Sequence, residues 1–234
     1  MSIHENLLRV RGRIAAAASQ ARRDPDEITL IGVSKTHPAE AIREAFAAGL
    51  RDFGENRVQE WEGKRAGVAD LRANWHLIGH LQSNKAGKAA KLFHAVDSVD
   101  DFALAQKLAR AKSDFLGGGK LRVLIEVHLG GEETKSGVAE EQLVELAEKI
   151  RGLDELDLAG LMCIPPYLED VKKVRPYFAH LRELREQLRS RLGMALPVLS
   201  MGMSHDFEAA ILEGATEVRV GTAIFGARSV ARQA

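Results

Sequence analysis

Lys35 is the residue whose type and setting most clearly suggest chemistry, because it ends the apolar run "ITLIGVSKTHP" at residues 28–38. One interpretation is that this lysine only marks the point where a buried strand meets water. The other is that partial burial at a strand end lowers the pKa of the ammonium, so that the neutral amine can attack an aldehyde. Lys35 is therefore a candidate for Schiff-base formation.

Polar residues follow several other apolar runs in the same way. The segments "GENR", "HLIGHLQSNK", "LSMGMSHD" and "RVGTAIFG" provide Asn56, Arg57, His76, His80, Ser200, Ser204, Arg219, Gly221 and Thr222. If these runs are parallel strands of one barrel, their C-terminal ends form a single active face. The polar residues then converge on one site with Lys35.

The runs that carry these residues are predicted strands, and amphipathic segments of helical spacing separate them. After an opening helix over about residues 3–22, eight strand units are predicted, at 28–35, 51–56, 74–79, 95–99, 120–130, 157–166, 197–202 and 217–226. Strands that are apolar on both faces and alternate with helices indicate a parallel sheet covered on both sides. Eight units without a glycine-rich phosphate motif after the first strand favour a (β/α)₈ barrel over a doubly wound open sheet.

The chain is predicted to be one domain over residues 1–234, with the barrel spanning 28–226 and "LGGGK" as a loop and not a linker. Thirty-three basic residues balance thirty-three acidic ones, which gives no electrostatic basis for binding nucleic acid or an anionic membrane. The single cysteine, Cys163, excludes an intrachain disulfide framework. Neither a signal-peptide pattern nor an apolar run of about 18 residues is present, so a cytoplasmic location is expected.

The last two strand units contain the parts of a phosphate site, which barrels often place there. Ser204 is predicted to cap the helix that begins with "HDFEAAILEG", and Gly221 and Thr222 offer a close backbone approach and a hydroxyl. The alternative is that Ser204 is only a helix cap and Gly221 only a turn. Asp206 and Glu208 disfavour an anion here unless their carboxylates point away from it.

A lysine after the first strand and a phosphate cradle after the last two together describe a site for pyridoxal 5′-phosphate. The segments "GVSKTHP", "FGENRVQE", "WHLIGHLQSNK", "KSG" and "LSMGMSHDFEAAILEGATEVRVGTAIFGAR" closely resemble the pyridoxal-phosphate homeostasis proteins, an alanine racemase N-terminal-domain-like family. The resemblance spans nearly the whole chain and implies a fold type III pyridoxal-phosphate barrel. It implies that Lys35 is the Schiff-base lysine, that Ser204, Gly221 and Thr222 bind the phosphate, and that Arg219 is the partner of the pyridine nitrogen.

The function implied by the resemblance is storage, delivery or buffering of pyridoxal phosphate, without efficient catalysis. Apo forms of pyridoxal-phosphate enzymes are candidate transient recipients, and a monomer is expected. The alternative is a single-domain pyridoxal-phosphate-dependent racemase or lyase. Arg219 disfavours it, because an arginine cannot accept a proton and would keep the ring a weak electron sink. Related racemases also take an acid/base tyrosine from an additional β-domain, for which a chain ending at residue 234 is expected to have no room.

Asn56, His80 and Ser200 are predicted to lie beside the cofactor, Asn56 by hydrogen bonding to its edge. A metal site is not predicted, because His76 and His80 straddle a strand end and no clear carboxylate partner accompanies them. His76 is expected to be a satisfied, partly buried residue.

Five further residues could do chemistry but have plainer interpretations. Tyr177 is predicted to pack within a helix, and Tyr167 is a weak candidate for a base at the barrel end. Cys163 is expected to be a small core residue. Lys85 and Lys135 could hold an aldehyde transiently during cofactor entry or exit, although each is more simply a solvated surface lysine.

Overall fold

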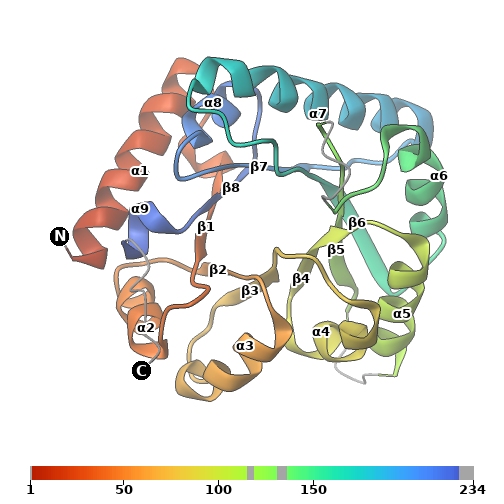
Figure 1. Cartoon of the computed structure of the whole chain (residues 1–234), viewed down its shortest axis with the longest axis horizontal. Helices are drawn as coiled ribbons and strands as arrows, with labels where there is room; N and C mark the ends of the chain where they lie inside the picture. The colour runs from red at the N-terminus through yellow and green to blue at the C-terminus, as the bar shows by residue number, and fades with distance from the viewer. Residues whose placement is uncertain (1, 115–118, 131–135, 227–234) are drawn as a thin grey trace.

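A computed structural model describes residues 2–114, 119–130 and 136–226, and it shows a closed barrel of eight parallel strands in chain order (Figure 1). The strands are β1 (Thr29–Val33), β2 (Asp52–Glu55), β3 (Asn74–Leu77), β4 (Ala95–Val99), β5 (Leu121–Glu126), β6 (Leu156–Met162), β7 (Val198–Met203) and β8 (Glu217–Val220). The ring closes through pairing of β1 with β8. The predicted (β/α)₈ class is confirmed, whereas the assignment of residues 1–234 to one cofactor-binding domain stays a prediction.

Helices surround the barrel (Figure 1). The helices are α1 (Ile3–Gln20), α2 (Ala39–Ala47), α3 (Val58–Lys64), α4 (Ala86–Leu92), α5 (Phe102–Ser113), α6 (Glu140–Arg151), α7 (Val171–Leu192), α8 (Phe207–Leu212) and α9 (Thr222–Phe225), with short 3₁₀ turns η1 (Pro25–Glu27), η2 (Arg65–Val68) and η3 (Ser83–Lys85). Their apolar stripes face inward, as periodicity predicts. Within the described ranges, no helix is long and apolar enough to cross a membrane.

The last predicted strand is too long. The strand ends at Val220, and the chain then turns into α9, whose Ile224 and Phe225 amides donate to the Gly221 carbonyl. Residues 222–225 are apolar enough to read as strand, but they form a helical turn at the end of the barrel. This correction moves Thr222 from a strand to the first position of α9.

The opening helix α1 is part of the frame that holds α9. Ser2 and Glu5 form a capping box at its start, and Leu7 and Val10 bury its inner face. Its buried Asn6 donates from Nδ2 to the Ile224 carbonyl at 2.9 Å. Figure 1 shows α1 running beside α8 and α9, so the first and last helices of the chain support each other.

A cluster of buried charges fills the barrel near the N-terminal ends of the strands. We call it the barrel floor, and its members are Asp52, His76, Asp97, Arg122 and Glu217. The ion pair between Arg122 and Glu217 joins β5 to β8, which are not neighbours in the sheet, so both side chains lie inside the barrel.

His76 is the centre of this floor. Its Nε2 lies 3.3 Å from Asp52 Oδ1 and its Nδ1 lies 3.4 Å from Asp97 Oδ2. Burial lowers the pKa of His76, but the hydrogen bonds to Asp52 and Asp97 outweigh burial and raise the pKa to about 9. The imidazolium therefore belongs to the folded structure at neutral pH.

We predict that the floor makes stability depend on pH through His76. The folded pKa of His76, about 9, exceeds the ordinary value of 6.5, so its contribution is complete below about pH 6.5 and is lost as the pH rises through about 9. Between these two values, wild-type unfolding free energy should fall relative to that of His76→Gln by an amount on the order of 1–3 kcal/mol. Urea titrations across this range measure it.

The control is His4→Gln, which changes an exposed histidine of α1 and should keep the wild-type pH dependence. If His76→Gln and the wild type lose stability in parallel as the pH rises, then deprotonation of His76 does not cause the loss of stability.

Candidate functional site

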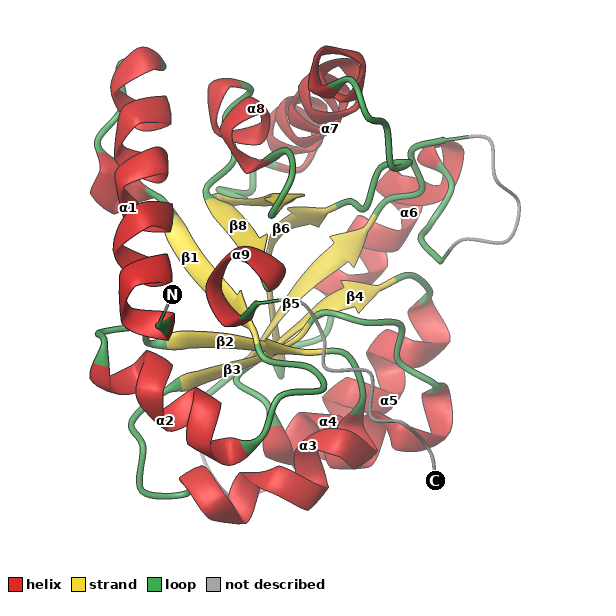
Figure 2. Ribbon diagram, turned by 60° about the vertical axis from the view of Figure 1, so that its left-hand side comes forward, coloured by secondary structure: helices red, strands yellow, loops and turns green. Residues whose placement is uncertain are grey.

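The expected site residues gather at the opposite end of the barrel from the floor. We call this end the barrel mouth; it consists of the C-terminal ends of the strands and the loops that follow them. Lys35, Asn56 and His80 follow β1, β2 and β3, while Ser204 and Thr222 follow β7 and β8. Figure 2 shows α9 beside the end of β1, which brings the first and last strand units together.

Lys35 lies in a turn directly after β1 and is half-buried. The buried Ser34 precedes it, and its carbonyl accepts the His37 amide at 3.1 Å to close the turn. Thr36 has a φ of 65°, which is the left-handed region that a β-branched residue rarely adopts. Tertiary contacts must therefore hold this turn in its conformation.

Those contacts come from Lys64 at the end of α3. Lys64 Nζ lies 2.9 Å from the Ser34 carbonyl and 3.4 Å from the His37 carbonyl. The same nitrogen lies 2.7 Å from Glu55 Oε1 and 3.1 Å from Glu60 Oε1. The Lys64 ammonium thus contacts both the Lys35 turn and two glutamates, Glu55 and Glu60.

The two glutamates also contact the turn directly. Ser34 Oγ donates to Glu55, and the Thr36 amide donates to Glu60. Glu55 is fully buried, and burial raises its pKa, although Lys64 and Ser34 act in the opposite direction. This cluster was not predicted from the sequence. The spacing of Glu60 and Lys64, four residues apart in "VQEWEGK", is nevertheless typical of an ion pair on one helix face.

Arg219 is buried inside the barrel, two residues beyond Glu217 on β8. Its Nη1 donates to Ser200 Oγ at 2.7 Å, and its Nη2 donates to the Cys163 carbonyl at 2.8 Å. The prediction that Ser200 and Arg219 belong to one site is consistent with this contact. Both of these acceptors are neutral, and within the described residues no carboxylate lies in ion-pair contact with this guanidinium.

Glu126 ends β5 near Arg219 and was not identified in the sequence. Ser136 Oγ donates to its Oε1 at 2.9 Å, while its buried Oε2 has no hydrogen-bond partner among the described residues. Burial raises the pKa of Glu126, and the Arg219 charge is among the influences that oppose this rise. The Glu126 Oε2 atom is therefore a buried oxygen that a hydrogen-bond donor on a ligand could contact.

The predicted capping role of Ser204 is wrong. Asp206 is the residue before α8, and its Oδ1 accepts the Met203 amide at 2.6 Å inside its own turn. Ser204 Oγ instead accepts the Ala223 amide at 3.4 Å, which links the loop after β7 to α9. The reason is that two residues, His205 and Asp206, separate Ser204 from the start of α8 at Phe207.

Asp206 and Glu208 would disfavour a phosphate near Ser204 if their carboxylates pointed toward it, but both side chains make other contacts. The Asp206 carboxylate is buried within its turn, and Glu208 forms an ion pair with Arg13 of α1. Gly221 lies close to β1, since a Cβ built there would be 3.3 Å from both the Val33 Cβ and its carbonyl oxygen. Ser204, Gly221 and Thr222 therefore lie together with both acidic side chains engaged elsewhere.

Asn56 and His80 lie on neighbouring loops. A Cβ on Gly79 would come within 2.6 Å of the Asn56 carbonyl oxygen, so the loops after β2 and β3 are in close contact. The His80 side chain is 57% exposed, and its Nδ1 lies 3.3 Å from Asp100 Oδ2. Their contact with a cofactor stays a prediction.

The expectation that no carboxylate accompanies His76 and His80 is wrong, because the aspartates of β2 and β4 and of the loop after β4 were not recognised as their neighbours. Ligand atoms of His76, Asp97 and Glu217 even lie within 4.8 Å of one another, a grouping that could hold a metal ion. Arg122 already pairs with Glu217 in this cluster. That the protein needs no metal stays a prediction.

The remaining candidates have ordinary surroundings. Tyr167 is 72% exposed and lies against His205, with ring centroids 5.2 Å apart, while Tyr177 packs against the core as predicted. Cys163 is buried, and burial raises the pKa of its thiol to about 12, which suits an unreactive core residue. Lys85 is half-buried at the end of η3, and Lys135 lies outside the described residues.

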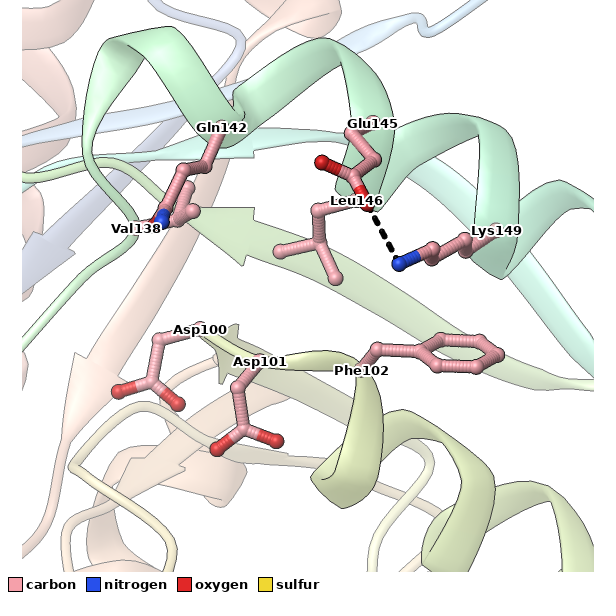
Figure 3. Close-up of a pocket in the computed structure, with 8 residues that line it drawn as sticks. All are labelled: Asp100, Asp101, Phe102, Val138, Gln142, Glu145, Leu146 and Lys149. Atoms are coloured by element: carbon pink, nitrogen blue, oxygen red, sulfur yellow. Dashed lines mark hydrogen bonds and ion pairs between the residues drawn. The ribbon is translucent and has the colours of Figure 1, made fainter.

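A pocket beside the barrel contains none of the predicted site residues (Figure 3). It lies between the start of α5 and α6 and is lined by Asp100, Asp101, Phe102, Val138, Gln142, Glu145, Leu146 and Lys149. An ion pair between Lys149 and Glu145 borders it at 2.6 Å. The pocket adjoins the barrel mouth through Asp100 of the loop after β4, which also lies 3.3 Å from His80.

A fold and a site of this kind define the class of barrels that is typified by the N-terminal domain of alanine racemase. The family model described as "Alanine racemase, N-terminal domain" matches residues 6–229, and the chain belongs to this family. Within it, the chain is 50% identical over 227 residues to the pyridoxal phosphate homeostasis protein of Pseudomonas aeruginosa, covering 97% of this chain and 96% of that one. It is 49% identical to the protein of the same name from Aquifex aeolicus, covering 97% and 99%.

Solved structures give the same result. The structure of PipY from Synechococcus elongatus with pyridoxal phosphate bound has a TM-score of 0.84 and 40% identity, covering 96% of this chain and 100% of that one. An alanine racemase from Clostridium difficile has a TM-score of 0.74 at 18% identity, covering 95% of this chain but 56% of that one. The racemase likeness shows the shared fold.

Proposed function

We propose that this protein binds pyridoxal 5′-phosphate at the barrel mouth and maintains the cellular supply of the cofactor by storing, delivering or buffering it. The observation that carries the proposal is the buried Arg219, whose guanidinium is held by a hydroxyl and a carbonyl, in the same barrel end as Lys35. Relatives at 49–50% identity carry the name pyridoxal phosphate homeostasis protein, and PipY holds the cofactor. These findings support the same assignment.

The residues present fit this group. A half-buried lysine can bond to the aldehyde, and a loop pair with a hydroxyl and backbone amides can receive the phosphate. When bound, the cofactor would supply an aldehyde, and the Lys35 amine would hold it through a covalent bond whose formation releases water. Ser204, Gly221 and Thr222 would hold the phosphate.

The other predicted contacts complete this assignment. Arg219, fixed by Ser200, would face the pyridine nitrogen, and Asn56 and His80 would border the ring. An arginine donates hydrogen bonds and does not accept a proton, so it would leave the pyridine nitrogen unprotonated. A ring in that state withdraws electrons weakly, and we therefore propose that the protein has no efficient catalytic activity of its own.

The setting of this function is also a proposal. We infer a cytoplasmic monomer that binds neither nucleic acid nor membrane, with apo forms of pyridoxal-phosphate enzymes as transient recipients. The equal number of basic and acidic residues supports the absence of nucleic-acid and membrane binding, because the chain has no excess of positive charge to attract a polyanion.

The main test concerns Lys35. Borohydride reduction of the protein loaded with pyridoxal phosphate should leave one stable adduct on the Lys35 peptide, located by mass spectrometry. Lys35→Ala should lose that adduct. Lys85→Ala, which changes another half-buried lysine after a strand, should retain it. A trapped peptide elsewhere, or full labelling of Lys35→Ala, would contradict the assignment.

The phosphate contacts can be tested by comparing two ligands. Hydrogen bonds to a charged group are worth about 1.5–3 kcal/mol each, so the double change Ser204→Ala with Thr222→Ala should weaken pyridoxal phosphate binding by a factor on the order of 10² or more. Binding of unphosphorylated pyridoxal should change little. Titration calorimetry measures both ligands, and equal losses would mean that the two side chains only support the loops.

The absence of efficient catalysis is testable by hydrogen exchange. We expect only trace deuterium incorporation at the α-carbon of alanine or serine when the loaded protein is incubated in heavy water and followed by NMR. Removal of an α-proton needs an electron-poor ring, and racemisation needs acid/base groups on both faces. Turnover in the ordinary enzyme range of about 1–10³ per second would establish the racemase or lyase alternative instead.

A further inference from the structure

Three elements hold the turn that carries Lys35: β2 through Glu55, α9 through Phe225 stacked on His37, and α3 through most of the polar contacts. Lys64 of α3 contacts the carbonyls of Ser34 and His37, and Glu60 of α3 accepts the Thr36 amide. The residues on both sides of Lys35 are therefore anchored. We propose that Lys64 is a positioning residue that places the Lys35 amine for attack on a bound aldehyde; this rests on the function proposed above.

The hydrogen-bond count explains why Lys64 acts in this way and does not itself form the covalent bond. Its ammonium has three hydrogens, and two carbonyls and two carboxylates lie within 3.4 Å of it. Its side chain is 12% exposed, and that of its partner Glu55 is 0% exposed. A buried cation in contact with this many acceptors is a fixed element of the fold.

The Lys64 cluster also explains the strained backbone. Thr36 has a left-handed φ of 65°, and such conformations persist only where the surroundings impose them. Loss of the Lys64 ammonium would free the carbonyls on both sides of Lys35. The turn could then relax toward an ordinary φ, and the Lys35 amine would move relative to the barrel mouth.

If Lys64 positions the Lys35 amine, its loss should affect covalent attachment of the ligand but not non-covalent binding. If Lys64 only supports the fold, its loss should affect both. Covalent attachment needs the Lys35 nitrogen close to the aldehyde carbon and correctly oriented. The proposed phosphate contacts come from the loop after β7 and from α9, and the proposed ring contacts come from β8 and the loops after β2 and β3. A misplaced amine should therefore impair attachment of pyridoxal phosphate. It should leave binding of pyridoxine 5′-phosphate unchanged, because that analogue has a hydroxymethyl group in place of the aldehyde.

The test variant is the double change Lys64→Met with Glu55→Gln, which removes the cation without leaving an unpaired buried carboxylate. The matched control is Lys88→Met with Glu62→Gln. In this second pair, Lys88 Nζ lies 2.8 Å from Oε1 of Glu62, which is also on α3. The Lys88 side chain is 55% exposed, and neither residue contacts the Lys35 turn. Stopped-flow absorbance measures the rate of attachment, and calorimetry measures the affinity for pyridoxine phosphate.

We expect attachment in the Lys64 variant to slow by about 10- to 100-fold, with affinity for pyridoxine phosphate within about threefold of wild type. The control should match wild type in both measurements. An unchanged attachment rate, or an equal loss for the two ligands, would overturn the proposal. Should the double variant not fold, Glu60→Ala provides the same test, because it removes the acceptor of the Thr36 amide at a partly exposed position.

Failure of the underlying function gives a different result. Wild-type protein that forms no borohydride-stable bond at Lys35 contradicts the proposed function before any variant is made. Wild-type attachment at Lys35 that survives unchanged in both the Lys64 and Glu60 variants contradicts only the positioning role.

Discussion

Charge pairing inside the barrel is the constraint on which the rest of the structure depends. A barrel of eight strands has an interior that side chains must fill, and here charged side chains occupy part of it. At the floor, Arg122 of β5 meets Glu217 of β8, and His76 lies between Asp52 and Asp97. Unpaired, each of these groups would be costly to bury. Their contacts join the adjacent strands β2, β3 and β4 and connect β5 to β8, which are not neighbours in the sheet.

The two ends of the barrel use this pairing differently. On β8, Glu217 and Arg219 are two residues apart and therefore face the same side of the strand. The first completes the floor with Arg122, and the second reaches toward the mouth, where it contacts only neutral acceptors among those described. One strand thus places an ion-paired carboxylate at one end and a guanidinium held by neutral acceptors at the other.

Much of this arrangement could be predicted from the sequence, because it follows from local patterns. Apolar runs separated by helical periodicity gave the eight strand units, and position after the first of them singled out Lys35. The length of the last strand was wrong, since residues 222–225 are equally apolar in a strand or a helical turn. The same local ambiguity produced the wrong cap at Ser204, whose hydroxyl contacts α9 and not α8.

The contacts that the sequence could not show are those that join elements distant in the chain. Lys64 is 29 residues beyond Lys35, and nothing in either segment indicates that one anchors the other. The carboxylate partners of His76 come from β2 and β4, and they become neighbours only when these strands pair with β3. Such pairings depend on strand order and register, which periodicity does not specify.

Two lysines at the mouth therefore take different roles because their surroundings differ. Lys64 is buried against carboxylates and carbonyls, which hold an ammonium well and restrict its movement. Lys35 is half-buried in the turn that Lys64 anchors, at the C-terminal end of β1, where barrels place reactive groups. The fixed Lys64 ammonium packs behind the strained turn and keeps the Lys35 amine in position. It does so through contacts with α3, β2 and the turn, and not through contacts with the ligand.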